Sequence, residues 1–201
     1  MRTCTCPVGT YLTTIGTNTC PTSFGQVQKL IFQRSGQAAG LGSTTTIKLL
    51  ATWTALLAST SSTKVVVTPF IAGFTPDPGK VREFGSGNEV RDGIPINFGT
   101  GPTKYTLKLY EPATSIVTNL KALECESLEV TLVNELGYYG HGGTAGVVKG
   151  FTVQQFHVSD RVLGGFDGPD YVEISFSMPP NWSSAFTITA PTDHSGLDHN
   201  G

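Results

Sequence analysis

The sequence has few charged residues. Asp, Glu, Lys and Arg make up only 14% of its 201 residues, against about a quarter in an average soluble domain. The formal net charge is −2 and the pI is about 6.1, so the chain lacks the basic surface typical of nucleic-acid binding. Gly is abundant at 24 residues, and Thr and Ser are frequent. A surface poor in charge and rich in small polar residues favours a protein that packs against neighbours.

Long hydrophobic runs are missing too. No segment approaches the roughly 18 uninterrupted apolar residues of a membrane-spanning helix, so we expect no membrane association. The first residues, MRTCTCPVGTYL, lack the apolar stretch of a secretory signal. We therefore expect synthesis in a cytoplasm, where early disulfide formation is disfavoured.

Catalytic signatures are equally absent. The stretch FGSGNEVRDG has Gly85 and Gly87 but no correctly placed third glycine or lysine of a phosphate-binding loop. His141 lies between glycines in YYGHGGTAG, without the strand–elbow–helix context of a hydrolase, and this composition is more typical of a turn tip. Asn181-Trp182-Ser183 matches a glycosylation acceptor only by chance, and Trp182, next to two prolines, is better interpreted as a packing anchor. We expect no enzyme, no catalytic residues, no bound metal and no cofactor.

Three of the four cysteines, Cys4, Cys6 and Cys20, fall in the opening stretch CTCPVGTYLTTIGTNTC. Structural zinc sites usually take closely paired ligands two to four residues apart, which this spacing does not provide. The four histidines contain no pair at helical metal-ligand spacing. Free thiols are favoured, while zinc bound by these cysteines with a distant donor, or a Cys6–Cys20 disulfide, stay open. Cys125 follows an apolar helical stripe, where a buried structural thiol is the default.

Alternating and β-branched segments predict strands. Apolar and polar residues alternate in TKYTLKLY and YVEISFSM, and dense apolar runs occur in VQKLIFQ, KVVVTPF and LEVTLVN. The predicted strands are 27–33, 64–70, 103–110, 128–134, 147–158, 171–178 and 185–190.

Two segments predict helices. Leu49, Trp53, Leu56 and Leu57 share one face of the first. The second runs from about Pro112 to Cys125, with Pro112 in its first turn and an apolar stripe of Ile116, Leu120 and Leu123.

Glycines and prolines crowd residues 72–101, with charges in the middle at Lys80, Arg82, Glu83, Glu89, Arg91 and Asp92. We interpret this segment as a long excursion or hairpin that projects from the fold and contacts a neighbour. The predicted organisation is an arm over residues 1–25, a domain over residues 26–193 and a polar tail over residues 194–201. The predicted fold class is mainly β: an antiparallel β-sandwich or barrel with one or two flanking α-helices and an extended N-terminal arm.

Two blocks carry a resemblance to a known family. They are GIPINFGTGPTKYTLKLYEPATSIVTNLKALECESLEVTLVNELGYYG and GFTVQQFHVSDRVLGGFDGPDYVEISFSMPPNWSSAFTITAPTD. Their order of loop, strand, helix and strands resembles tail tube and related tail or head–tail structural proteins of tailed bacteriophages. The stretches CPTSFGQVQKLIFQR and ATWTALLASTSSTKVVVTPF are similar to virion proteins of phages that infect Bacteroidetes, crAss-like phages among them. The resemblance covers most of residues 20–193 and implies no catalytic residues.

Three functional hypotheses follow. The first is a non-enzymatic virion protein that forms rings in a tail or connector, with itself and other virion structural proteins as partners and DNA only as passing cargo. The second is a capsid auxiliary or decoration protein. The third is a carbohydrate- or receptor-binding module, for which Tyr138 and Tyr139 are the candidate aromatic residues.

Overall fold

The computed structural model describes residues 23–37, 40–85, 96–143, 146–166 and 168–199. It divides the chain into two compact units. The larger unit contains the described residues of 24–79 and 101–199, and the smaller one is described at residues 23, 80–85 and 96–100. Residues 1–22, which include Cys4, Cys6 and Cys20, lie outside the described part of the chain.

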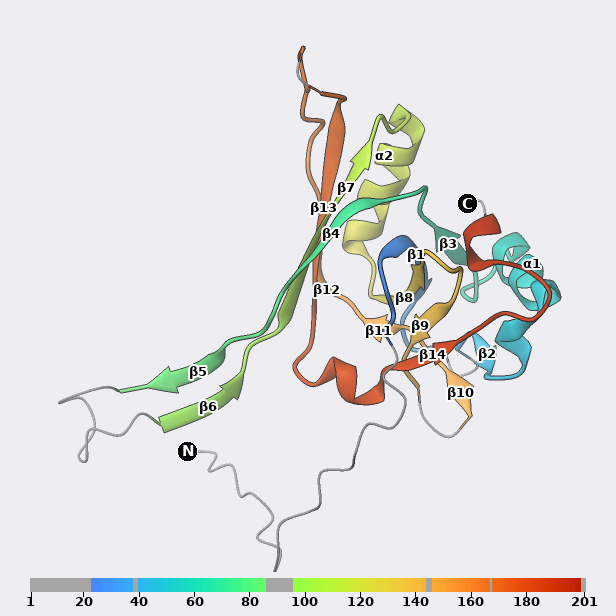
Figure 1. Cartoon of the computed structure of the whole chain (residues 1–201), viewed down its shortest axis with the longest axis horizontal. Helices are drawn as coiled ribbons and strands as arrows, with labels where there is room; N and C mark the ends of the chain where they lie inside the picture. The colour runs from blue at the N-terminus through green and yellow to red at the C-terminus, as the bar shows by residue number, and fades with distance from the viewer. Residues whose placement is uncertain (1–22, 38–39, 86–95, 144–145, 167, 200–201) are drawn as a thin grey trace, which may run out of the picture. The chain divides into compact units, whose positions relative to one another are not determined.

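The first sheet of the larger unit is antiparallel and has the strand order β14-β9-β8-β1-β3, with β11 also paired to β8 (Figure 1). Its strands are β1 (Val27–Arg34), β3 (Val65–Val67), β8 (Leu128–Asn134), β9 (Tyr139–His141), β11 (Phe151–Thr152) and β14 (Thr187–Thr189). The central strands β1 and β8 bury nearly every residue, because this sheet is covered on both faces.

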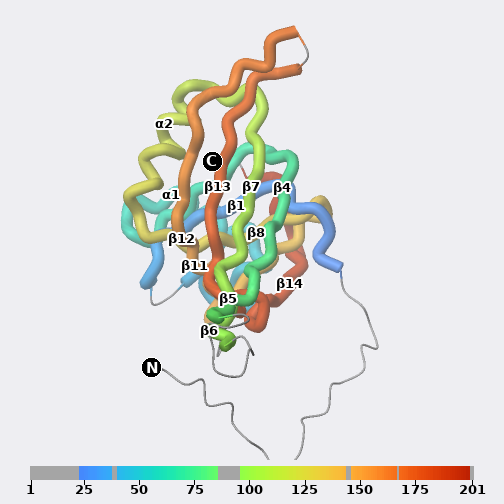
Figure 2. Tube along the Cα trace, turned by 90° about the vertical axis from the view of Figure 1, so that its left-hand side faces the viewer, coloured from blue at the N-terminus to red at the C-terminus, as the bar shows by residue number. Residues whose placement is uncertain are grey.

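The second sheet has the antiparallel order β12-β13-β7-β4, and Figure 2 shows its four strands side by side. They are β4 (Ala72–Asp77), β7 (Thr103–Tyr110), β12 (Gln154–Val158) and β13 (Tyr171–Met178). The inward-facing residues of β7 and β13, such as Leu107 and Ile174, pack with Leu30 and Val130 of the first sheet in one buried cluster. The predicted mainly β, antiparallel sandwich is confirmed, and the alternation in β7 and β13 predicted the buried face correctly.

The other face of the first sheet carries a second core beneath α1 (Leu50–Ala58). Trp53 is fully buried there beside Ile31 and Val133. Leu49, predicted on the same helical face, is 43% exposed instead. It precedes the helix with an extended backbone, so its side chain does not follow the helical stripe. A 3₁₀ turn, η1 (Thr46–Lys48), and the two-stranded pair β2 (Gly42–Ser43) and β10 (Val147–Val148) complete this side.

The second predicted helix is α2 (Thr114–Ala122), extended by the 3₁₀ turn η3 (Leu123–Cys125). Leu120 is buried, and Ile116 and Leu123 pack against the main core, as the stripe predicted. Pro112 lies before the first turn and not in it, because α2 begins at Thr114 with Ala113 as its N-cap.

The segment predicted as one strand over residues 147–158 is three short strands. β10, β11 and β12 pair with three different partners, β2, β8 and β13. Gly150 allows the first change of partner, since a Cβ there would come within 2.8 Å of the Val130 backbone nitrogen. Gln155, with φ of 54°, forms part of a bulge in β12.

The excursion predicted over residues 72–101 belongs to both units. Its first six residues form β4 of the sandwich, where Phe74 stacks on Tyr105 at 4.9 Å. Its remainder contains a two-stranded antiparallel hairpin of β5 (Val81–Phe84) and β6 (Ile96–Thr100). Gly79 and Gly101 pass so closely that a Cβ on Gly79 would lie 2.1 Å from the Gly101 carbonyl oxygen.

Candidate functional site

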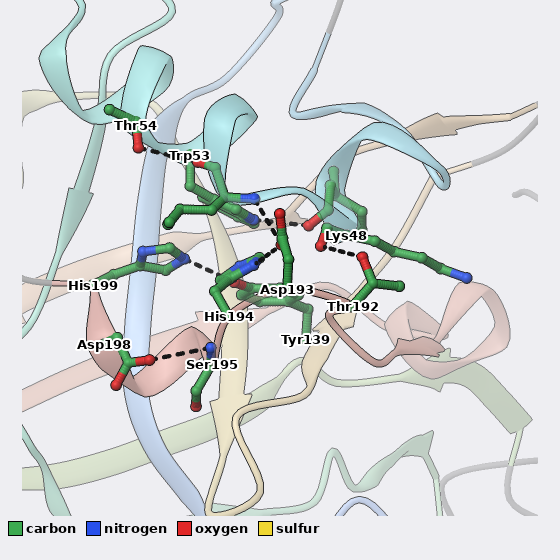
Figure 3. A network of polar contacts seen from close by, with 12 residues as sticks. Lys48, Trp53, Thr54, Tyr139, Thr192, Asp193, His194, Ser195, Asp198 and His199 are labelled. Atoms are coloured by element: carbon green, nitrogen blue, oxygen red, sulfur yellow. Dashed lines mark hydrogen bonds and ion pairs between the residues drawn. The ribbon is translucent and has the colours of Figure 1, made fainter.

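A buried polar network joins strand β9 to the C-terminal residues (Figure 3). The Tyr139 hydroxyl lies 2.7 Å from Nε2 of His194 and 2.7 Å from Nε2 of His199. Its ring stacks on Trp53 at 4.7 Å. Asp193 Oδ1 lies 2.8 Å from Nδ1 of His194. The C-terminal residues include the 3₁₀ turn η5 (Gly196–Asp198), which starts with a capping box. In it, the hydroxyl of the N-cap residue Ser195 accepts a hydrogen bond from the Leu197 backbone nitrogen.

The single hydroxyl proton of Tyr139 fixes how the two imidazoles are arranged. If Nδ1 of a neutral His194 donates to Asp193, its Nε2 accepts the Tyr139 proton. His199 must then donate its own Nε2 proton to the Tyr139 oxygen. A neutral His199 can make all of these hydrogen bonds. A protonated His199 would place a second positive charge close to the ammonium group of Lys29.

Lys29 brings a basic side chain to the C-terminal residues. Its ammonium donates to the carbonyl oxygens of Leu197 and His199, each at 2.7 Å, and lies 4.5 Å from the centre of the Phe70 ring. Burial lowers the pKa of Lys29. Burial, with smaller contributions from His194 and Lys29, also lowers the pKa of His199 to about 4.

This network resembles an acid–base relay but is closed to substrates. Tyr139 is fully buried, His199 is 3% exposed, and the side chain of His194 is 3% exposed. None of Tyr139, His194 and His199 lines any of three pockets on the larger unit. The network therefore binds the C-terminal residues to the first sheet. Across the described residues, no group of three or more His, Cys, Asp or Glu side chains could hold a metal ion.

His141 is not at a turn tip. It lies in β9, where its Nε2 is 2.9 Å from the Thr189 hydroxyl of β14, and burial lowers its pKa. The pairing of Gly140 with Ile188 of β14 explains why a glycine-rich stretch is a strand here. Cys125 was expected to be buried and is exposed, because it ends η3 beyond the apolar stripe of α2.

The two tyrosines proposed for ligand binding lie in different environments. Tyr139 is fully buried in the second core, and Tyr138 is 37% exposed. Trp182, predicted as a packing anchor, packs edge-on against Tyr105, Phe151 and Phe186.

The hairpin of the smaller unit presents exposed apolar side chains. We call them the hairpin patch: Val81, Phe84, Ile96 and Phe98, each 49–57% exposed. Phe84 and Phe98 meet edge-on with ring centres 6.1 Å apart. A two-stranded hairpin is at best marginally stable by itself in water. Burial of these apolar side chains against another protein surface would therefore stabilise it.

A second apolar surface lies on the larger unit. We call it the aromatic groove, a hollow of about 490 Å³. Its lining includes Phe24, Phe74, Pro76, Pro78, Tyr105, Trp182 and Phe186. Trp182 is held by a hydrogen bond from its Nε1 to the Thr103 hydroxyl at 3.2 Å. Burial raises the pKa of Tyr105 to about 12, so it stays a neutral part of the wall.

Sequence reasoning found the excursion but missed both surfaces. The groove combines residues from five separate segments, which no local pattern connects. The hairpin patch had a usable signal in VREF and INFGT, where large apolar residues flank polar ones in two stretches rich in breakers.

Comparison with known proteins gives little family information. No protein-family model matches the chain, and no curated protein matches it. Among solved structures it is similar to one described as "Cryo-EM structure of the anti-feeding prophage (AFP) baseplate, 6-fold symmetrised". The two share 10% sequence identity with a TM-score of 0.37, over 87% of this chain and 98% of that chain.

Proposed function

We propose that this chain is a non-enzymatic structural subunit of a tailed-bacteriophage virion. In this proposal its copies assemble into rings, as part of a tail tube, a connector or another tail component. The hairpin patch is the observation that carries the proposal. Four large apolar side chains stand about half exposed on a hairpin whose two strands, within the described residues, pair only with each other.

The rest of the molecule supports a role in packing against neighbours. Only 14% of the residues are charged, which keeps the desolvation cost of a large interface low. The polar network that could be mistaken for a catalytic site is buried. Within the described residues, no helix is both long and apolar enough to cross a membrane.

The proposed subunit has three parts. Residues 1–25 form an arm that contacts a neighbour, residues 26–193 form the assembling domain, and residues 194–201 form a polar C-terminal segment. Its partners are further copies of itself and other structural proteins of the virion, with DNA only as passing cargo if the ring encloses a lumen. The narrower assignment to crAss-like phages of Bacteroidetes depends on the sequence blocks quoted above.

Removal of the hairpin patch tests the proposal. The double variant Phe84→Ser/Phe98→Ser should keep the fold of the larger unit and lose assembly, because it removes both exposed rings. Sedimentation velocity over a range of concentrations measures the loss. The matched control is Leu136→Ser/Leu163→Ser, which removes two side chains that are 62% and 75% exposed on the larger unit. Equal assembly of the hairpin variant and the control would contradict the proposal.

A further inference from the structure

The hairpin patch and the aromatic groove are two unpartnered apolar surfaces carried by every copy of the chain. We infer that the groove receives the hairpin patch of a second copy, an inference that rests on the assembly proposed above. The two surfaces differ, so each contact leaves one free patch and one free groove. Heterologous contacts of this kind propagate and close into a ring when the rotation between copies permits it.

The groove is built to accept apolar side chains without rearranging. Phe24 meets Phe186 edge-on at 5.3 Å, and Tyr105 meets Trp182 edge-on at 5.9 Å. These contacts hold the rings apart at fixed angles, with Trp182 further held by its bond to Thr103. A preformed aromatic wall of this kind favours an aromatic guest, since ring pairs gain energy beyond the area that they bury.

The groove's edge argues against an added backbone strand as its occupant. β4 is the terminal strand of its sheet, and Pro76 lies within it. Proline has no N–H to donate, so a neighbouring strand could not form a continuous ladder along this edge. The occupant must therefore bind through side chains, and the hairpin presents Phe84 and Phe98 as such a pair.

Charge distribution matches the two surfaces. On the hairpin, Lys80 and Arg82 flank Val81, and Glu83 pairs with Asn97 of β6. At the groove, the Glu135 carboxylate lies against Gly25, where a Cβ would be 2.1 Å from its Oε1. Asp77 pairs with Lys104 of β7, so the alternation of β4 places it on the opposite face from the groove-lining Pro76. Lys80, Arg82 and Glu135 form no ion pair with a described residue. The basic residues beside the patch can therefore meet Glu135 beside the groove, which speeds association.

A complementation experiment tests the inference. Phe84→Ser/Phe98→Ser disables the patch, and Pro76→Lys/Pro78→Lys disables the groove by placing positive charges where Lys80 and Arg82 would approach. Ser61→Lys/Ser62→Lys adds the same charge at exposed positions elsewhere and serves as the control. Thermal melting of each variant verifies that the larger unit is folded.

The expected result is specific to a contact between unlike surfaces. Each disabled variant alone should sediment as a monomer, while the control assembles like the unmodified chain. An equimolar mixture of the two disabled variants should form heterodimers and nothing larger, because only one intact patch–groove pair exists. A folded mixture that stays monomeric, or a groove variant that assembles normally, overturns the inference. If the unmodified chain never assembles, the proposed function fails as well.

Charge reversal provides a second, independent measurement. Arg82→Glu should weaken assembly on the order of tenfold, and Glu135→Arg in the same chain should restore it. If Glu135→Arg does not restore assembly, Glu135 does not contact Arg82 of the neighbouring copy. If deletion of residues 1–22 abolishes assembly while Phe84→Ser/Phe98→Ser does not, the groove binds the N-terminal segment and the inference is wrong.

Discussion

Leu120 is the residue through which α2 packs on the sandwich. It is 4% exposed and belongs to the main core. Leu120→Ala should lower the free energy of unfolding by about 2–5 kcal/mol, since it removes buried apolar contacts and leaves a cavity. Urea unfolding measures this value, and Leu163→Ala, at a position 75% exposed, is the control. A loss below about 0.5 kcal/mol would show that α2 is not part of the core.

His199 should make stability depend on pH. Its pKa is about 4 in the folded protein and about 6.5 in an unfolded chain. Between these values the unfolded chain binds more protons, so the free energy of unfolding should fall as the pH drops from about 6.5 to about 4. The shift corresponds to at most about 3 kcal/mol, and no further loss from this group is expected below pH 4.

The variant His199→Gln isolates this contribution. This variant should be less stable at pH 7, because it alters the hydrogen bond to Tyr139, but its side chain does not titrate. Urea unfolding at pH 7, 5.5 and 4 should therefore give a shallower pH dependence for the variant than for the unmodified chain. Lys29, His194, Asp193 and Asp198 are unchanged in both proteins, so equal slopes would assign the pH dependence to them instead.

Single residues were the least predictable level. Leu120 was correctly placed in the core, because a helical stripe encodes burial locally. Trp53, predicted on an apolar helical face, is buried too. The environments of His141 and Cys125 were not, because each depends on a distant partner or on where a helix ends. The contact of His194 and His199 with one hydroxyl of β9 has no local sequence signal.

At the scale of elements, the N-terminal segment should matter for assembly and not for folding. Its apolar residues, Val8, Tyr11, Leu12 and Ile15, are too scattered to form a core. Deletion of residues 1–19 should leave the melting temperature of the monomer nearly unchanged and weaken assembly. Calorimetry and sedimentation velocity on the same samples measure both. A truncated chain that assembles as well as the full chain would mean that the segment plays no part.

The thiols of this segment should be dispensable. Cys4→Ser/Cys6→Ser should fold and melt like the unmodified chain, because terminal segments contribute few core contacts. Metal analysis of the purified protein provides the check. Stoichiometric zinc, together with unfolding on addition of a chelator, would restore the metal-site interpretation.

Strands with a clean alternation were predicted to within a residue, as in β7 and β13. Their side chains alone decide which face is buried. The segment over residues 147–158 was mispredicted because its strands change partners at Gly150, a choice made by the rest of the fold. β4 was missed for a related reason, since its pairing with β7 prevails over the proline and glycine that argue against a strand.

At the scale of the whole molecule, composition and element order predicted the fold class, whereas the hairpin patch and the aromatic groove came only from the structure. A low charge content indicates a protein that packs against others, but not where it does so. The groove needs Phe24, Phe74 and Trp182 together, and these residues are brought to one place by the stacking of the two sheets.

The central claim is that copies of this chain form rings through unlike surfaces. Electron microscopy of the full-length protein at rising concentration tests it most directly. The account predicts closed rings of one copy number that become more abundant with concentration, stack into short tubes, and are absent from the Phe84→Ser/Phe98→Ser variant. Monomers or trimers at every concentration, especially ones that bind empty phage heads, would contradict it and favour a capsid decoration protein.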